Sequence, residues 1–248
     1  MKNNKAQKKV GILGFGEVGQ AIAKFYKKPL IKDLKRKDDF SGVQILHVCI
    51  PWNDKFISTA LKEIKSTNPE LVIIHSTIIP GTTKKIAKAI SKRINVVHSP
   101  IRGIHPYLYE GVKTFVKYIG ADSQEAGKAA QSHLESLGIK TKVFYPSSTT
   151  ELGKLLDTSY YGVCIAWHAE MAEMCKKFGV NFEAAVRDFN KTYNEGYAKL
   201  GMPQVVRPVL FSPRGGIGGH CIVPNAKILK KYFKNKKGLD LILKYQTK

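Results

Sequence analysis

Three glycines near the start of the chain have the spacing that holds the diphosphate of a dinucleotide. Gly14, Gly16 and Gly19 follow the apolar run 10–13 and lead into the helix-compatible residues 20–26. Gly14 can make the tight turn, Gly16 lets the backbone approach a pyrophosphate, and Gly19 lets the helix pack against the strand. Free amides at the helix start favour a negative charge there. The expected diphosphate site therefore comprises Gly14, Phe15, Gly16, Glu17, Val18 and Gly19.

An acidic residue follows at the distance expected of a carboxylate that binds ribose. Asp33 lies nineteen residues after Gly14, at the end of a second apolar run, and a carboxylate there accepts hydrogen bonds from ribose hydroxyls. Because it would repel a 2'-phosphate, we favour NAD over NADP. An ordinary turn residue is the alternative for Asp33. Three basic residues keep NADP open, since they could accommodate the extra phosphate: Lys35, Arg36 and Lys37.

A cysteine after a glycine-rich loop is the second group that could do chemistry. Cys221 follows the sequence GGIGGH, and Pro224 indicates that a helix begins there. A helix start favours the thiolate, which is the reactive form of cysteine. Cys221 is therefore a candidate nucleophile, with a small buried side chain as the alternative. We interpret the remaining cysteines as structural because they lie in apolar strand or helix patterns: Cys49, Cys164 and Cys175.

The composition is that of a globular protein with a sizeable core. The chain has 248 residues, of which 43% are hydrophobic, and a net charge of +22. It lacks both an apolar run of about 18 residues and a signal-peptide pattern, so we expect no membrane partner. The cysteine spacing predicts neither disulfides nor a metal site and favours the cytoplasm. The charge comes mostly from evenly spread lysines, which makes nucleic acid an unlikely partner.

Apolar strands alternate with amphipathic helices over the first part of the chain. This alternation predicts an α/β fold, a Rossmann-type doubly wound parallel sheet with helices on both faces and ligands at the carboxyl ends of the strands. We expect this dinucleotide-binding domain over residues 1–147, with 100–113 irregular. The expected strands are 10–13, 30–34, 43–50, 71–74, 95–97, 114–119 and 142–145, and the later helices are 53–65, 83–92 and 123–137.

From residue 149 the pattern becomes one long helix that reaches about residue 178. Ser148 or Thr149 could cap its start together with Glu151. Apolar residues cover most of its circumference, so neighbouring helices or a second chain must bury it. We expect a helical domain over residues 148–248 and a homodimer through the long helix. Asn181 is expected to cap a further helix that ends near residue 200.

Taken together, these residues resemble the UDP-glucose/GDP-mannose dehydrogenase family, whose members oxidise the primary alcohol of a sugar nucleotide to a carboxylate with two NAD. The likeness lies in the stretches GILGFGEVG, HVCIPWND, HSTIIPGTT and SPRGGIGGHC, and in the helix ELGKLLDTSYYGVCIAWHAEMAEMC. These stretches follow one another in the family's order from residue 10 to about 230. The resemblance implies an NAD-dependent oxidoreductase that acts on a CH-OH group.

The resemblance also implies roles for individual residues. Cys221 would attack an aldehyde to give a thiohemiacetal, which a second oxidation converts to a thioester for hydrolysis. Lys154 would stabilise the developing oxyanion, with a solvated surface lysine as the alternative. Thr77 would hold a water molecule, with a turn residue at the end of a strand as the alternative. The resemblance further places Pro51 and Ser76 with the cofactor, and Gly218 and Gly219 with the substrate.

Several positions depart from the family pattern. Thr158 stands where the family has asparagine, Asn225 replaces an aspartate that is a candidate base, and Ile101 replaces a glutamate used in hydrolysis. We keep Thr158 and Asn225 as catalytic candidates. Arg102 is a candidate for binding an anionic group of the substrate, because arginine binds carboxylate or phosphate in bidentate fashion; His105 and Arg214 are weaker ones. The family's third domain, which grips the nucleotide, is missing from these 248 residues.

Three functional hypotheses follow. The leading one is an NAD-dependent dehydrogenase whose substrate is a nucleotide sugar or a smaller polar alcohol. The alternative is a catalytically degenerate homologue that binds NAD, and the reactivity of Cys221 towards a thiol reagent separates these two. Nucleic-acid binding through the lysines is the third hypothesis, and it predicts an association that weakens steeply with salt.

Overall fold

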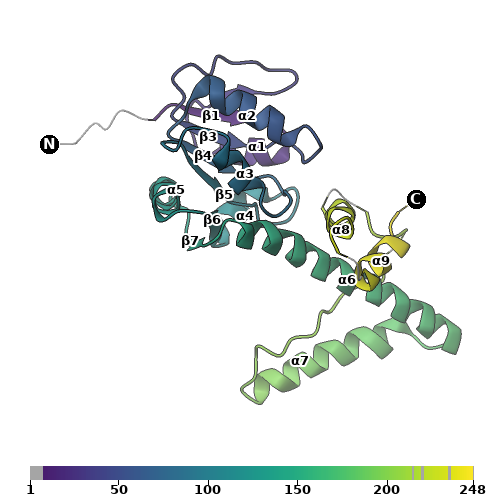
Figure 1. Cartoon of the computed structure of the whole chain (residues 1–248). Helices are drawn as coiled ribbons and strands as arrows, with labels where there is room; N and C mark the ends of the chain where they lie inside the picture. The colour runs from purple at the N-terminus through teal and green to yellow at the C-terminus, as the bar shows by residue number, and fades with distance from the viewer. Residues whose placement is uncertain (1–7, 214, 219–220, 234–235, 248) are drawn as a thin grey trace. The chain divides into compact units, whose positions relative to one another are not determined.

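A computed structural model describes residues 8–213, 215–218, 221–233 and 236–247. They divide into two compact units, and the boundary along the chain lies between Lys154 and Leu155 (Figure 1). The first unit contains β1 (Val10–Leu13), α1 (Glu17–Ala23), β2 (Leu30–Lys32), β3 (Ile45–Val48), α2 (Phe56–Thr67), β4 (Leu71–Ile74), α3 (Thr82–Lys88), β5 (Asn95–His98), α4 (Leu108–Thr114), β6 (Lys117–Ala121), α5 (Gln124–Ser136), β7 (Thr141–Phe144) and the start of α6 (Ser148–Phe178).

The strands of the first unit form one sheet in the order β2-β1-β3-β4-β5-β6-β7. β1 pairs in parallel with β2 on one side and with β3 on the other, so the chain reverses its direction of winding at β1. Such a switch point opens a ligand crevice outside the carboxyl ends of the strands. The predicted doubly wound α/β sheet is thereby confirmed.

One strand departs from the fully parallel sheet that the sequence predicts. β6 runs antiparallel to β5, with Val97 opposite Ala121 and His98 opposite Gly120, and β7 is parallel to β6. The β5–β6 connection contains only α4, a seven-residue helix in a region that the sequence predicts to be irregular. A parallel crossover must carry the chain back along the whole strand, usually on a longer helix. The chain does not cross back here: it passes through α4, and β6 begins at the carboxyl edge.

Alternating side chains of the buried strands build a core on each face of the sheet. Ile45 and Ile73 point into the core under α1, α4 and α5, whereas Leu46 and Ile74 point into the core under α2 and α3. All four are at most 1% exposed, and burial of each contributes about 1.5–3 kcal/mol. The helices thus cover both faces (Figure 1) and leave the strand ends as the place for polar groups.

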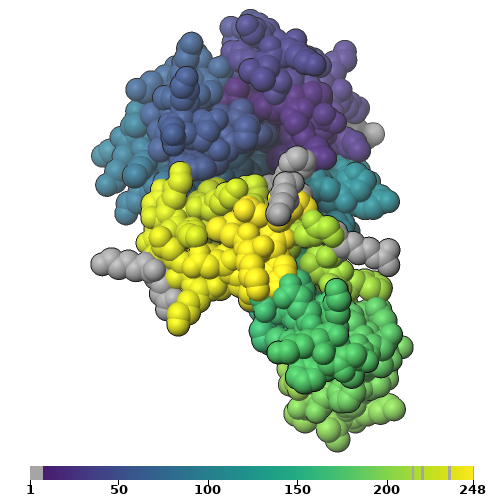
Figure 2. Space-filling view, turned by 90° about the vertical axis from the view of Figure 1, so that its right-hand side faces the viewer, coloured from purple at the N-terminus to yellow at the C-terminus, as the bar shows by residue number. Residues whose placement is uncertain are grey.

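The second unit is helical. It contains the rest of α6, the π-helix η1 (Glu183–Asp188), α7 (Phe189–Lys199), α8 (Ile222–Lys230) and α9 (Lys237–Lys244). The predicted long helix is confirmed, since α6 has 31 residues. Ala226 of α8 and Ile242 of α9 pack with Ala166 of α6 in the core, and Figure 2 shows α8 and α9 in yellow-green and yellow as one continuous mass. Asn181 caps the next helix by accepting a hydrogen bond from the Ala184 amide at 3.0 Å.

Gly162 explains how close these helices come. A Cβ atom at this position of α6 would lie 2.6 Å from Ile222 and 3.0 Å from Ile242, so any side chain would force α8 and α9 away from α6. By contrast, α7 buries none of its own side chains. Within the described part of the chain, the helices are all too short or too polar to cross a membrane.

Candidate functional site

The glycine loop after β1 has the geometry that a diphosphate needs. Gly14 has φ +92°, and a Cβ atom there would lie 2.8 Å from the Cys49 carbonyl carbon. At Gly19 a Cβ atom would lie 2.0 Å from the Gly14 carbonyl oxygen, which explains the close contact between α1 and the loop. A Cβ atom at Gly16 would meet nothing within 4 Å, because this residue faces open space at the start of α1. The open backbone at Gly16 thus fits an approaching phosphate.

Asp33 is joined to this loop by a direct hydrogen bond. The Phe15 amide donates to Asp33 Oδ2 at 2.7 Å, and the Leu34 amide donates to Asp33 Oδ1 at 2.7 Å. The carboxylate therefore lies beside the glycine loop, at the carboxyl ends of β1 and β2. Arg36, which the sequence presents as a possible phosphate ligand, instead pairs with Asp38 at 2.7 Å. Arg36 is thus engaged by a neighbouring carboxylate, while Lys35 and Lys37 are exposed.

The ends of β3 and β4 carry three further candidates for the site. Ser76 is 8% exposed and donates from Oγ to the Ile50 carbonyl at 2.6 Å, which ties the two strand ends together. Pro51 is exposed and Thr77 is half-buried. Because β1, β2, β3 and β4 are parallel, these residues lie along the same edge of the sheet as Gly14 and Asp33.

The first turn of α6 is fixed to this edge by a buried histidine. Burial lowers the pKa of His98 to about 3, so the ring is neutral and carries one hydrogen. The Ser76 carbonyl, 3.1 Å from His98 Nε2, can only accept, which places that hydrogen on Nε2. Nδ1 therefore accepts from the Thr150 hydroxyl at 2.8 Å. Ser76 is thereby held to α6 through His98.

Glu151 caps a different helix from the one that the sequence suggests. It is expected to cap α6, in which it lies, but its carboxylate accepts from the Gly81 and Thr83 amides at the start of α3. Oε1 lies 2.7 Å from the Thr83 nitrogen, and the residue is completely buried. Burial raises the pKa of Glu151, and the hydrogen bonds from Thr83 and Gly81 oppose that shift.

Lys117 is a buried amine near the site that the sequence analysis missed. It is 3% exposed, and its Nζ donates to the Ser99 carbonyl at 2.9 Å and the Pro100 carbonyl at 3.1 Å. Burial lowers its pKa to about 7, with a further lowering by the positive charge of Lys154. A lysine within the apolar pattern FVKYIGA is the one signal in the sequence that could have identified it.

Arg102 packs on aromatic rings rather than standing free in solvent. Its guanidinium carbon lies 4.7 Å from the Tyr118 ring centre and 5.7 Å from that of Phe115. His105 pairs with Glu17 of the glycine loop, at 2.7 Å between Nδ1 and Oε2. Arg102 is half-buried, so stacking pre-orients a side chain that still reaches solvent.

A chain of hydrogen bonds between histidine rings and a tyrosine hydroxyl crosses one face of the sheet. His75 Nδ1 lies 2.8 Å from the Ser99 carbonyl, which can only accept, so His75 Nε2 accepts from His47 Nδ1 at 2.8 Å. His47 Nε2 then accepts from the Tyr26 hydroxyl at 2.8 Å, and that hydroxyl accepts from His133 Nε2 at 2.7 Å. Burial lowers the pKa of both His47 and His75 well below the usual value, so these rings stay neutral at neutral pH.

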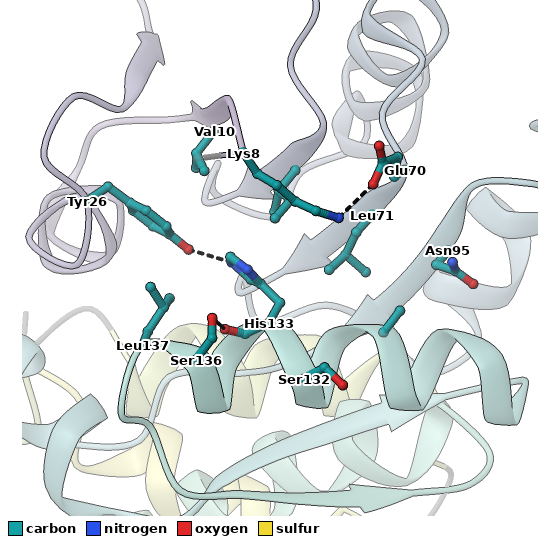
Figure 3. A pocket seen from close by; sticks show the side chains of 12 residues that line it. Lys8, Val10, Tyr26, Glu70, Leu71, Asn95, Ser132, His133, Ser136 and Leu137 are labelled. Carbon is teal, nitrogen blue, oxygen red and sulfur yellow. Dashed lines mark hydrogen bonds and ion pairs between the residues drawn. The ribbon is translucent and has the colours of Figure 1, made fainter. Parts of the chain in front are cut away.

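A cavity of the first unit lies at the other edge of the sheet. It has a volume of about 500 Å³ and is lined by the amino ends of β1, β3, β4 and β5 and by α5. Figure 3 shows Lys8 paired with Glu70 across it and His133 bonded to Tyr26 at its side. It contains none of the residues predicted for the cofactor or substrate.

Cys221 begins α8 and is half-buried. In the same unit, Asn225 is 4% exposed, and its backbone N–H donates to the Cys221 carbonyl at 3.1 Å as part of the first turn of α8. Thr158 of α6 is 9% exposed. Gly218 is exposed, and its loop is fixed by Ile217, whose carbonyl accepts from the Thr247 amide at 3.0 Å. Gly219, His220 and Arg214 lie outside the described residues.

The structure distributes the predicted residues over both units. The strand ends of the first unit bring together the glycine loop, Asp33, Pro51, Ser76 and Thr77, and this unit also contains Arg102 and Lys154. Burial raises the pKa of Cys49 to about 12, which disfavours the reactive thiolate at this position. Among the described residues, no cluster of His, Cys, Asp and Glu is arranged to hold a metal ion.

Known proteins share both sequence and fold with this chain. Residues 148–246 match the model of the UDP-glucose/GDP-mannose dehydrogenase family, central domain. A UDP-N-acetyl-D-mannosamine dehydrogenase of Methanococcus maripaludis strain C7 is 31% identical over 153 residues, covering 61% of this chain and 33% of that protein. The enzyme of that name from Pyrococcus horikoshii is 25% identical over 241 residues, covering 90% of this chain and 54% of that protein.

A solved structure agrees with these sequence matches. The UDP-D-ManNAc dehydrogenase from Pyrococcus horikoshii superposes with a TM-score of 0.76 at 20% identity, covering 96% of this chain and 68% of that chain. At this identity the match shows a shared fold. The chain spans about a third to a half of the length of the curated relatives named above. The resemblance seen in the sequence is thereby confirmed: residues 148–246 match the model of the central domain of the UDP-glucose/GDP-mannose dehydrogenase family, and the chain is similar in sequence and fold to UDP-N-acetyl-D-mannosamine dehydrogenases.

Proposed function

We propose that the chain is an NAD-dependent dehydrogenase that oxidises a CH-OH group, as the names of its relatives suggest. The observation that carries this proposal is the hydrogen bond from the Phe15 amide to Asp33 Oδ2, 2.7 Å long, beside the open backbone of Gly16. It supports a cofactor site in which the carboxylate would bind the ribose and the loop amides the diphosphate, at one edge of the sheet. Bound NAD would supply the oxidant by accepting a hydride from the substrate.

Each candidate residue of the site has a proposed role in cofactor binding or catalysis. Gly14 to Gly19 would hold the diphosphate, Asp33 the ribose, and Pro51 and Ser76 would line the cofactor site. Lys154 would stabilise the negative charge on the substrate oxygen when the alcohol proton leaves. Thr77 would hold a water molecule, and Thr158 and Asn225 would support the reacting groups.

A second oxidation would require a covalent step at Cys221. The thiolate would form a C–S bond with the aldehyde carbon, giving a thiohemiacetal whose loss of a hydride and a proton leaves a thioester. Water would release the acid and return the thiol. Ile101 stands where the family has glutamate, and Asn225 cannot take up a proton. A single oxidation to the aldehyde is therefore the smaller activity that this chain could retain.

The substrate would be a nucleotide sugar or a smaller polar alcohol with an anionic group. The names of the relatives favour the former. Arg102, stacked on Tyr118, would bind the anionic group, and Gly218 and Gly219 would contact the substrate. A homodimer through α6 would cover exposed apolar side chains such as Trp167, which is 48% exposed. Four free cysteines fit a reducing, cytoplasmic location.

Turnover with a substrate panel tests the proposal. The protein is incubated with NAD and a series of UDP-sugars, GDP-sugars and small hydroxy acids while NADH absorbance is followed. We expect turnover with at least one compound. Where the wild type completes the second oxidation and yields two NADH per substrate, the Cys221→Ser variant should yield one. Cys164→Ser is the matched control. Intact NAD binding without turnover on any compound would contradict the enzyme and support an NAD-binding homologue.

A further inference from the structure

The segment between β4 and α3 is held at both ends by neighbouring residues of α6. This segment, residues 76–83, includes the first two residues of α3. It carries the cofactor candidate Ser76 and the catalytic candidate Thr77. Thr150 reaches its first residue through His98, and Glu151 binds its last residues directly. Both contacts lie within the first unit.

The contact at the start of the segment is satisfied when the Thr150 hydroxyl donates to His98. Since the Ser76 carbonyl accepts from His98 Nε2 at 3.1 Å, Nδ1 needs a donor, and the Thr150 hydroxyl lies 2.8 Å away. The Ser147 carbonyl, 3.1 Å from the same hydroxyl, is a more distant acceptor. His98 is fully buried and Thr150 is 4% exposed. Water therefore does not compete for these bonds, and loss of the Thr150 hydroxyl would leave a buried ring nitrogen without a donor.

The contact at the end of the segment requires a carboxyl group in which each oxygen can accept a hydrogen bond. Glu151 receives two backbone amides, those of Gly81 and Thr83, and it is completely buried. A glutamine at this position has one acceptor oxygen, and its NH₂ group would face the other amide donor. The geometry of the Gly81 turn, which has φ +90°, therefore depends on the carboxylate.

A glycine in β6 lets α6 come this close. A Cβ atom at Gly120 would lie 2.1 Å from Thr150 Oγ1 and 2.7 Å from the Ser147 carbonyl. The preceding turn is fixed as well, since Ser147 donates from Oγ to Asp122 at 2.7 Å. The first turn of α6 is thus a rigid support, and Lys154 lies on the next turn of the same helix.

We propose that Thr150 and Glu151 are positioning residues that hold residues 76–83, and with them Ser76 and Thr77, in register with Lys154. The catalytic part of this inference rests on the proposed function. Neither residue needs to touch substrate: each acts by fixing a segment that does. A displacement of about 1 Å in a reacting group can cost about a hundredfold in rate, so a loosened segment should lower kcat. The segment also carries Ser76, but the glycine loop and Asp33 lie outside it and should limit the loss of NAD affinity.

The Glu151→Gln variant tests the end of the segment, with Asp157→Asn as the control because Asp157 is an exposed carboxylate on the same helix. We expect faster hydrogen exchange at the Gly81 and Thr83 amides and a kcat lowered by about 10- to 100-fold. The KM for substrate and the Kd for NAD should stay within about threefold of the wild type. Unchanged exchange, or an unchanged kcat with faster exchange, would overturn the proposal.

The Thr150→Val variant tests the start of the segment and keeps the inference falsifiable if Glu151→Gln does not fold. Valine preserves the shape of threonine and removes the hydroxyl, whereas Thr150→Ser keeps a hydroxyl and should restore kcat. Equal activity of the valine and serine variants would contradict the role of the hydrogen bond. If the wild type itself lacks turnover, the proposed function fails, but the exchange measurement still decides whether these residues hold the segment.

Discussion

At the scale of single residues, the partners of Lys117 suit an uncharged amine. A neutral amine has two N–H groups, and Nζ has two acceptors, the carbonyls of Ser99 and Pro100. An ammonium would bring a third hydrogen into a site that is 3% exposed. Its burial therefore costs free energy that an uncharged side chain would avoid.

This difference predicts how the stability of a Lys117→Met variant compares with that of the wild type at different pH. The pKa of Lys117 is about 7 in the folded state and about 10.4 in an unfolded chain, so the unfolded state binds more protons in between. The free energy of unfolding of the wild type should therefore rise relative to the variant from about pH 7 to 10, by at most about 1.4 kcal/mol per pH unit.

Chemical denaturation of both proteins across this range measures the difference. Lys140→Met provides the control because Lys140 is exposed, and its difference from the wild type should not change with pH. A Lys117→Met difference that is equally flat would show that Lys117 is charged in the folded protein.

Asp33 gives a second prediction at this scale, on cofactor preference. Asp33→Ala removes the acceptor of the Phe15 amide and the proposed ligand of the ribose. We expect the Kd for NAD to rise about tenfold, which corresponds to about 1.4 kcal/mol. The Kd for NADP should rise less or fall, because a negative charge near the 2'-phosphate is lost. Calorimetric titration with each cofactor measures both constants.

Asp39→Ala is the matched control for this titration, because Asp39 is an exposed carboxylate of the same loop region. It should leave both affinities unchanged. Equal losses of affinity for NAD and NADP in Asp33→Ala would mean that the carboxylate supports the glycine loop without selecting between the cofactors.

At the scale of elements, α7 offers a second exposed apolar surface for the homodimer proposed through α6. Phe189, Tyr193 and Leu200 are 62%, 49% and 71% exposed, and they line a hollow of about 500 Å³ on this helix. Exposed apolar patches of this kind mark interaction sites. We expect sedimentation velocity to show a dimer, and Phe189→Glu to shift it towards the monomer. Ile104→Glu, at an exposed apolar residue of the first unit, should remain dimeric, and a monomeric wild type would contradict the expectation.

Elements differ in how far the sequence predicts them, for physical reasons. Runs such as LVII in β4 are buried on both faces, so their composition alone identifies them. α4 was missed because a seven-residue helix depends on its tertiary contacts, here through Leu108 and Val112. Glu151 was assigned to its own helix because capping rules describe neighbours in sequence, whereas its partners lie about seventy residues away.

At the scale of the whole molecule, the same distinction applies to the candidate site. The glycine loop and Asp33 follow from local spacing, since one strand-turn-helix unit fixes their geometry. The roles of His98 and Lys117 depend on burial by segments that meet only in the folded chain. A histidine or lysine in a sequence shows nothing of the partners that determine its charge.

The reversed direction of β6 has a consequence for which residues reach the ligand edge. In an all-parallel sheet, a strand delivers its last residue to that edge, which here would be Ala121. Because β6 is inverted, with His98 opposite Gly120, its opening residue Lys117 arrives there instead. The polarity of a single strand thus replaces a methyl group by an amine beside the Ser99 and Pro100 carbonyls, without any change in the sequence of the strand.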